Sequence, residues 1–351
     1  MLRRISRILG ALLLSSAPLA AQGGERLFYY TDTEASYNSF VAHVASIDIL
    51  APSAYSVDDD GVVYGDVDRR VLALAQQHRV RVVPLLVNRG FDQARLHTLL
   101  ASDAARSRMI ASMLELCRRH EYAGFQIDFE NLSIDDRDAF TRFYREAADA
   151  LHQAGKQISV AVVHRPDELA GVTAYHEWLM DSWRGGYDLK ALADAGDFVT
   201  VMTYSQHTRR TPPGPGAALP WVEQNVAYFL RFMPPEKLSL GVSTGAMRWY
   251  TSYEERITPE LARSFSEGIS YRWAMGLLER NNASLQWSEE HQSSYGFYPV
   301  GGTFEWIFLE DARSFRTKLA LIDRQQLRGF SAWVLGPEDP AVWDALPPRS
   351  R

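Results

Sequence analysis

From residue 27 onwards, the chain alternates between short apolar segments typical of strands and longer amphipathic segments typical of helices. The strand pattern occurs eight times, at residues 27–31, 46–51, 80–87, 124–129, 157–163, 198–204, 238–243 and 329–335. Helical patterns lie between most of them, at about residues 67–78, 103–120, 135–154, 219–231 and 312–325. This order predicts a closed α/β barrel, the (β/α)8 TIM barrel, over residues 25–345. An open doubly wound sheet is the alternative, weakened because no glycine-rich phosphate loop follows the first strand.

One connection is too long for this pattern. About 65 residues separate the seventh expected strand from the last helix, and they are rich in Tyr, Trp, Ser and Glu. A loop of that length in a compact domain needs structure of its own. We therefore predict a small α+β insertion at residues 247–308, on the C-terminal face of the barrel where active sites of this fold lie. Its aromatic content favours a wall of a binding cleft over a purely packing role.

The N-terminus has the pattern of an export signal over residues 1–21. Arg3, Arg4 and Arg7 precede the apolar residues 8–14, and small residues follow up to Ala21. The apolar run is too short to span a membrane, and no later stretch of the chain qualifies. We expect the protein to be periplasmic or extracellular.

Charge and cysteine content narrow the choice of partners. The net charge of −6 becomes −9 once the three arginines of the signal are removed, so a nucleic-acid partner is disfavoured. The only cysteine, Cys117, lies within an expected helix, and a single cysteine forms no internal disulfide. We expect Cys117 to be buried and without a catalytic role.

The fourth expected strand ends in two acids separated by one apolar residue. Asp128 and Glu130 alternate with Phe125, Ile127 and Phe129. Side chains alternate faces along a strand, so the two carboxylates are expected on one face, roughly 6–7 Å apart, with the apolar side chains on the other. Two carboxylates at the end of a buried strand are costly unless they are used. The alternative is a strand end with two solvated acids.

Other strand ends supply groups that suit carbohydrate chemistry. The sixth expected strand ends at Tyr204, followed by Ser205 and His207, and the eighth contains Trp333. One cleft can then hold a carboxylate pair, a tyrosine hydroxyl and a tryptophan face. In glycoside cleavage a carboxylic acid donates a proton to the leaving oxygen while an apolar platform seats the sugar ring.

With these motifs the chain resembles glycoside hydrolase family 18, in particular its spore-lysin-like branch of peptidoglycan N-acetylglucosaminidases. The resemblance covers nearly the whole chain after the signal. It rests on the segments 124–131 (GFQIDFEN), 201–204 (VMTY) with His207, 219–222 (LPWV), 310–314 (EDARS) and 329–336 (GFSAWVLG).

The resemblance implies a role for each matching residue. Glu130 falls on the proton donor, Asp128 and Tyr204 on the groups that hold the substrate acetamido group, and Trp333 on the floor of the subsite. It implies a retaining, substrate-assisted reaction in which the acetamido oxygen replaces a carboxylate nucleophile. It also implies a substrate with N-acetylglucosamine on the non-reducing side of the cleaved bond, and no cofactor.

Two positions depart from the general family pattern. Gln126 stands where the family has a further Asp, although an amide is familiar there in the spore-lysin-like branch. It removes a carboxylate that could share a proton with Asp128. Ser205 stands where the family usually has Asp directly after Tyr204, which puts rate and substrate choice in question.

Further candidates for substrate contact are aromatic side chains and histidines near the expected strand ends. We predict Gln126, His207, Tyr30, Trp221 and Trp249 as substrate-binding residues, with His164 less supported. Structural packing is the alternative for each of them. No His or Cys cluster has zinc spacing, and the Asp58–Asp60 run fails the EF-hand pattern, so no metal is expected.

Three functions remain open. The first is an exported glycosidase acting on an N-acetylglucosamine polymer, with peptidoglycan ahead of chitin. The second is a non-catalytic glycan-binding barrel, which Gln126 and Ser205 motivate. The third is a hydrolase of another amino-sugar glycan, such as an exopolysaccharide or an N-glycan core. We expect a monomer.

Overall fold

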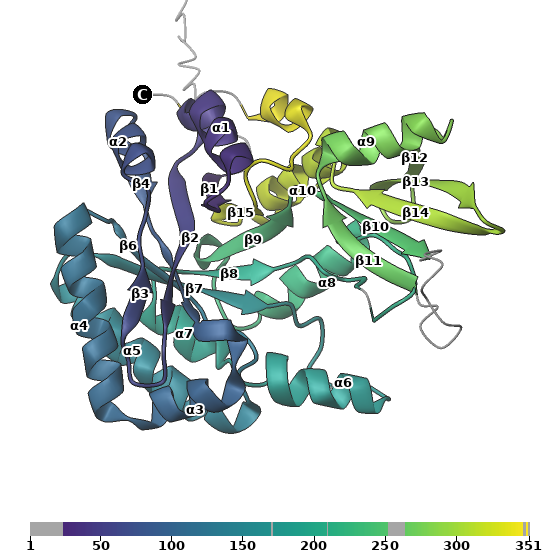
Figure 1. Cartoon of the computed structure of the whole chain (residues 1–351). Helices are drawn as coiled ribbons and strands as arrows, with labels where there is room; N and C mark the ends of the chain where they lie inside the picture. Colours follow the sequence, from purple (N-terminus) through teal and green to yellow (C-terminus); the bar gives the residue numbers. More distant parts are fainter. Residues whose placement is uncertain (1–23, 170, 209, 252–263, 347–348, 350–351) are drawn as a thin grey trace, which may run out of the picture.

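The computed structural model describes residues 24–169, 171–208, 210–251, 264–346 and 349. Within them, eight parallel strands form a closed ring: β1 (Glu25–Tyr30), β2 (Ile49–Val57), β5 (Leu85–Asn88), β6 (Gly124–Asp128), β7 (Gln157–Val163), β8 (Phe198–Met202), β9 (Leu238–Ser243) and β15 (Gly329–Trp333). The ring closes because β1 pairs with both β2 and β15. The TIM-barrel prediction is confirmed (Figure 1). The expected signal peptide, residues 1–21, lies outside the described residues.

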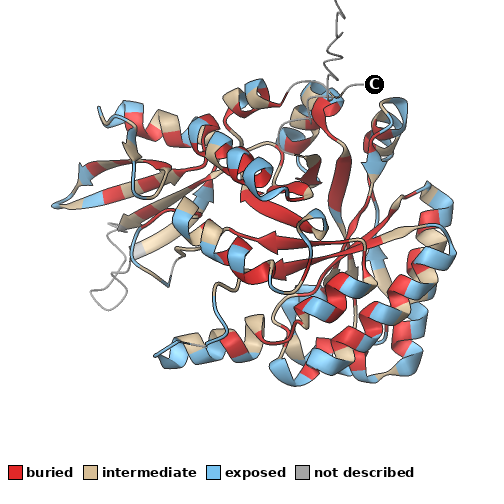
Figure 2. Cartoon of the chain, turned by 180° about the vertical axis from the view of Figure 1, so that it is seen from behind, coloured by how far each residue is buried: buried red, intermediate tan, exposed pale blue. Residues whose placement is uncertain are grey.

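The helices cover the outside of this ring. They are α1 (Glu34–His43), α2 (Arg69–Gln77), α3 (Gln93–Ala101), α4 (Asp103–His120), α5 (Arg137–Gln153), α6 (Ala174–Leu179), α7 (Leu189–Ala195), α8 (Leu219–Phe229) and α10 (Ala312–Gln325). Figure 2 shows their inner faces buried and their outer faces exposed. The sequence pattern did not predict α1, α3, α6 or α7. The last two are short, and short helices carry little periodic signal.

Two of the expected strands differ from the observed ones by more than a shift of one or two residues at an end. The segment 80–87 is divided into β4 (Arg81–Val82) and β5, with Pro84 between them, because proline has no N–H to donate to a ladder. The segment 46–51 begins as strand only at Ile49 and continues to Val57, where β2 also pairs with the antiparallel β3 (Val63–Gly65). The prediction missed the extension because Pro52 interrupts the apolar run.

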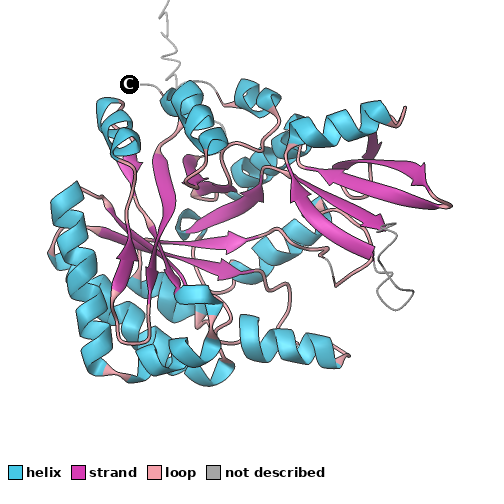
Figure 3. Ribbon diagram, in the orientation of Figure 1, coloured by secondary structure: helices cyan, strands magenta, loops and turns pink. Residues whose placement is uncertain are grey.

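A second sheet follows β9 and lies beside the barrel (Figure 3). Its antiparallel strands are β10 (Ala246–Thr251), β11 (Ser264–Ile269), β12 (Gln286–Ser288), β13 (Ser293–Val300) and β14 (Thr303–Leu309), in the order β11-β10-β14-β13-β12. Helix α9 (Tyr271–Arg280) buries Ala274 and Leu278 against it, in an apolar cluster separate from that of the barrel. In Figure 1 this sheet and α6 lie on the side toward which β7 and β8 point.

Cys117 is buried, as the sequence predicted. It lies on α4, and burial raises the pKa of its thiol to about 11, so it is a neutral apolar group. No helix among the described residues is both long enough and apolar enough to cross a bilayer.

Candidate active site

The acid pair stands where β6 leaves the barrel. Asp128 is the last residue of the strand, and the carboxyls of Asp128 and Glu130 line one cavity of about 790 Å³. Asn88, at the end of the neighbouring β5, holds the backbone of Glu130. Its side-chain amide donates to Glu130 O and accepts from Glu130 N, at 3.0 Å each. The Tyr187 hydroxyl donates to the Phe129 carbonyl at 2.7 Å, so the backbone on both sides of the acid is fixed.

Burial sets the protonation of the two carboxyls. Asp128 is 7% exposed, and its Oδ1 has no hydrogen-bond partner among the described residues. Burial, and next the charge of Glu130, raise the pKa of Asp128 well above its usual value. Burial raises the pKa of Glu130 to about 7. Two buried acids this close resist double ionisation, so the pair retains at least one proton near neutral pH.

Below the pair, a closed polar network fills the inside of the barrel. The Gln126 amide accepts from the Tyr29 hydroxyl at 2.7 Å and donates to Ser159 Oγ at 3.1 Å and to Thr200 Oγ1 at 3.2 Å. Thr200 continues the chain to Ser331. Every amide atom of Gln126 is thus used, and its side chain is fully buried and does not line the cavity. The sequence predicted that Gln126 contacts the substrate. In the structure its amide instead supports the site from the inside of the barrel.

Aromatic side chains form the rest of the cavity wall. Trp333 and Tyr204 lie at one part of it, and burial raises the pKa of Tyr204 well above its usual value, so its hydroxyl stays a donor. Trp221 lines another part, with its ring 4.8 Å from that of His164. Burial lowers the pKa of His164 to about 3, so this imidazole is neutral.

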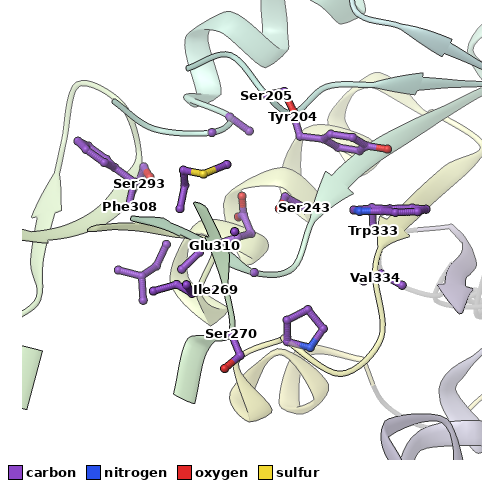
Figure 4. A pocket seen from close by; sticks show the side chains of 18 of the residues that line it. Tyr204, Ser205, Ser243, Ile269, Ser270, Ser293, Phe308, Glu310, Trp333 and Val334 are labelled. Carbon is purple, nitrogen blue, oxygen red and sulfur yellow. The ribbon is translucent and has the colours of Figure 1, made fainter. Parts of the chain in front are cut away.

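A second cavity of about 440 Å³ meets the first at Tyr204, Ser205 and Trp333. It lies between the barrel and the second sheet, with Phe308 and Glu310 among its lining residues (Figure 4). His207 lines this second cavity rather than the one that holds the acids, and its Nδ1 lies 3.1 Å from the Pro212 carbonyl.

Besides Gln126, two predicted binding residues lie outside both cavities. Tyr30 is 4% exposed in the core, and its neighbour Tyr29 lines the cavity instead. Successive strand residues face opposite sides, so an error of one position exchanges the core and the site. Trp249 is 2% exposed within β10, edge-on to Phe308 at 5.7 Å.

Sequence reasoning missed part of the wall that follows β7. Trp183 and Arg184, at the end of a π-helical turn (Met180–Arg184), line the cavity that holds the acids. Their position in the connection after a barrel strand, on the C-terminal face, is the signal that could have identified them. No group of three or more His, Cys, Asp or Glu side chains suited to a metal ion occurs among the residues described.

Comparison with known proteins agrees with this geometry. The model of the family "Glycosyl hydrolases family 18" matches residues 26–338. The cortical fragment-lytic enzyme of Bacillus subtilis is 30% identical over 263 residues, which are 75% of this chain and 58% of that protein. The chain therefore spans less than two thirds of the length of that relative.

Solved structures resemble the whole fold. A chitinase from Chromobacterium violaceum superposes with a TM-score of 0.81 at 23% identity, covering 92% of this chain and 98% of that one. The spore cortex-lytic enzyme SleL of Bacillus cereus gives 0.82 at 21% identity, covering 93% and 74%. At these identities the likeness bears on the fold alone.

Proposed function

The chain belongs to glycosyl hydrolase family 18 and is a glycosidase, and from this premise we propose that it cleaves the bond after N-acetylglucosamine in a cell-wall polymer, with peptidoglycan ahead of chitin. We further propose that it acts after export, because residues 1–21 have the pattern of a signal peptide. The name of the Bacillus subtilis relative, a cortical fragment-lytic enzyme, favours peptidoglycan. The chitinase with the same fold keeps chitin as the alternative.

The observation that carries the proposal is the buried acid pair with one unpartnered oxygen. Asp128 Oδ1 lacks a donor, and it lies in a cavity that also holds Glu130 and Tyr204. An amide N–H of a 2-acetamido sugar is a donor that would satisfy it. The pKa of Glu130, raised to about 7, keeps this carboxyl protonated for donation to a leaving oxygen.

The proposed reaction proceeds in two steps. Glu130 protonates the glycosidic oxygen while the acetamido carbonyl oxygen attacks the anomeric carbon, so that the glycosidic bond breaks and an oxazolinium ring forms. Asp128 accepts the amide N–H and stabilises the positive ring, and Tyr204 donates to the acetamido group. Water then attacks the anomeric carbon from the vacated side, with Glu130 taking its proton, and the ring opens with retained configuration.

The arrangement of acids supports the substrate as nucleophile. Among the described residues that line this cavity, Asp128 and Glu130 are the only acids. Both come from the end of one strand, two positions apart, and so approach a bound sugar from one direction. A carboxylate nucleophile would have to attack from the face opposite the acid.

Product analysis by mass spectrometry tests the proposal. Wild type, Glu130→Gln and the matched surface variant Glu115→Gln, whose acid is 45% exposed on α4, are incubated with peptidoglycan and separately with chitin oligomers. We expect products with reducing-end N-acetylglucosamine from wild type and Glu115→Gln, and a rate lower by about 10²–10⁴ for Glu130→Gln. Full turnover by Glu130→Gln would overturn the assignment of the acid. Binding without products from any of the three proteins would favour a glycan-binding barrel and direct attention to Ser205.

A further inference from the structure

Arg184 is a cation in the cleft, and no group that neutralises it is found in the part of the chain that the structure describes. It lines the cavity of Asp128 and Glu130, and no side chain among the described residues forms an ion pair or hydrogen bond with its guanidinium. The neighbouring Arg165, by contrast, is paired with Glu168 at 3.5 Å. Burial lowers the pKa of Arg184, which reflects the cost of keeping this charge away from water.

Among the described residues, the groups next to the Arg184 guanidinium include hydrogen-bond donors, and none of them accepts a hydrogen bond from it. The nearby imidazole of His164 is neutral, since burial and the charge of Arg184 lower its pKa. The two acids of the cavity hold at least one proton between them. The indole N–H of the adjacent Trp183 is buried and also lacks an acceptor among the described residues. Both residues line the same cavity, and two donors without acceptors among the described residues fit a ligand that carries an oxyanion.

The position of Arg184 is fixed relative to the catalytic acid. The two glycines that follow it pack so closely on the loop after Glu130 that a Cβ on Gly185 would lie 2.7 Å from Ile134 Cδ1, and one on Gly186 2.5 Å from Leu132 Cγ. Next in the chain, Tyr187 donates to the Phe129 carbonyl. The segment that carries the Arg184 guanidinium is therefore held by packing and by a hydrogen bond against the backbone on both sides of Glu130.

The two ends of the cleft can be told apart from the strand order. Trp333 ends β15, whereas Arg184 follows β7, and β8 and β9 lie between these strands in the ring. On the proposed function, the acetamido sugar lies over Trp333 and against Asp128. Glu130 and Arg184 then lie on the side of the sugar that leaves.

We propose that Arg184, with the Trp183 N–H, binds a carboxylate on the sugar that leaves, so that the preferred polymer alternates N-acetylglucosamine with an acidic sugar. This inference rests on the proposed function. Chitin has no such carboxylate. A lactyl ether of the muramic acid type and a uronic acid both supply one.

A consequence concerns the preceding reaction. In peptidoglycan that carries peptides, the lactyl carboxylate is consumed in an amide bond. An amide hydrolysis that removes the peptide must come first if Arg184 is to meet a free carboxylate. Glycan strands stripped of peptide are therefore expected to be cleaved faster than intact ones.

The test compares Arg184→Gln and Arg184→Lys with the control Arg231→Gln, which removes an exposed charge already paired with Glu168. Substrates are peptide-free peptidoglycan strands, the same strands with methylamidated carboxylates, hyaluronan oligosaccharides and chitin oligosaccharides. We expect Arg184→Gln to lower kcat/KM on peptide-free strands about 10- to 100-fold, because hydrogen bonds to charged groups contribute most, and to leave chitin nearly unchanged. Arg184→Lys should be intermediate, since it keeps the charge and loses the fork. Hyaluronan cleavage that depends on Arg184 would identify a uronic acid as the source.

Methylamidation should reduce cleavage by wild type by the same factor and leave Arg184→Gln unaffected. Equal losses on acidic and neutral substrates, or no discrimination by wild type, would overturn the inference while leaving the glycosidase intact. Binding by calorimetry in the Glu130→Gln background separates the two proposals. A carboxylate preference that disappears with Arg184→Gln supports the inference even without turnover, and its absence there contradicts it.

Discussion

Two buried acids on either side of Trp333 have opposite surroundings. In the second cavity, both oxygens of Glu310 accept from Lys318 Nζ, at 2.8 and 2.7 Å, and Lys318 is 1% exposed. In the first cavity, Asp128 is equally buried, yet its Oδ1 has no partner among the described residues. Burial raises the pKa of both acids, but only Glu310 has a cation that lowers it again.

The difference separates structure from chemistry. The Glu310–Lys318 pair joins the end of β14 to α10 and thereby fixes the second sheet to the barrel. In such a buried pair each charge is neutralised and hydrogen-bonded by its partner, so neither group needs a ligand. Asp128 retains a desolvation cost that the fold does not offset, which is typical of a group whose partner arrives with the substrate.

Replacing Asp128 by Asn should reduce kcat by about 10²–10³, because the amide keeps the shape and loses the charge that stabilises the cationic intermediate. The same change removes a buried carboxyl without a partner, so the melting temperature should not fall. Turnover assays beside thermal unfolding check both parts. Unchanged kcat would mean that the unpartnered oxygen is not used in the reaction.

Replacing Lys318 by Met should act in the reverse way. Removing one partner of a buried pair leaves a buried charge and should cost about 3–5 kcal/mol of unfolding free energy, measured by urea titration. Adding Glu310→Gln should recover much of that loss. In conditions where the variant is folded, kcat/KM should stay within a few-fold of wild type. A selective loss of turnover in the folded protein would place Glu310 in the reaction and break the comparison.

The raised pKa of Glu130 should make both kcat and the stability of the protein depend on pH. The pKa of Glu130 is raised to about 7, and the protonated form is the active acid. The value of kcat should therefore fall about tenfold per pH unit above that pKa. Because the folded pKa lies above the unfolded one, the stability linked to Glu130 is full at low pH and is lost as the pH rises to about 7. Glu130→Gln should show a smaller loss of stability than wild type, because only the contribution of Asp128, whose pKa burial also raises, remains. Melting curves from pH 4 to 8 are the check.

The alternation of side chains along a strand predicted some site residues correctly and others wrongly. Strand parity correctly grouped Asp128 and Glu130 on one cavity, even though the strand ends at Asp128. Parity failed for Tyr30, because residues 27–30 of the first strand are uncharged and large on both faces and do not reveal which face points inward. Parity also could not show how deep a side chain lies in the barrel. Gln126 shares a face with Asp128, but it lies two residues earlier on β6, where the Tyr29 hydroxyl donates to its amide.

The place of Arg184 after a barrel strand could have suggested it as a candidate, but its orientation toward the cavity could not be predicted. Its orientation depends on a π-helical turn and on close packing of two glycines against the loop after Glu130, which are properties of the tertiary structure. A local pattern contains no trace of such contacts. The resemblance to a family carried the shared motifs and could not supply a residue outside them.

The smallest predicted effect concerns Trp273, which is 49% exposed on α9 and lines the second cavity. If a long glycan extends past Trp333 into this cavity, it covers the exposed indole, and the loss of that apolar contact is worth about 1 kcal/mol. Trp273→Ala should then raise KM roughly fivefold for long oligomers. Oligomers confined to the first cavity should be unaffected. Phe304→Ala is the matched control, because Phe304 is 50% exposed on β14 and lines neither cavity. A length-independent change in KM, or an equal change with Phe304→Ala, would mean that the second cavity only joins the sheet to the barrel.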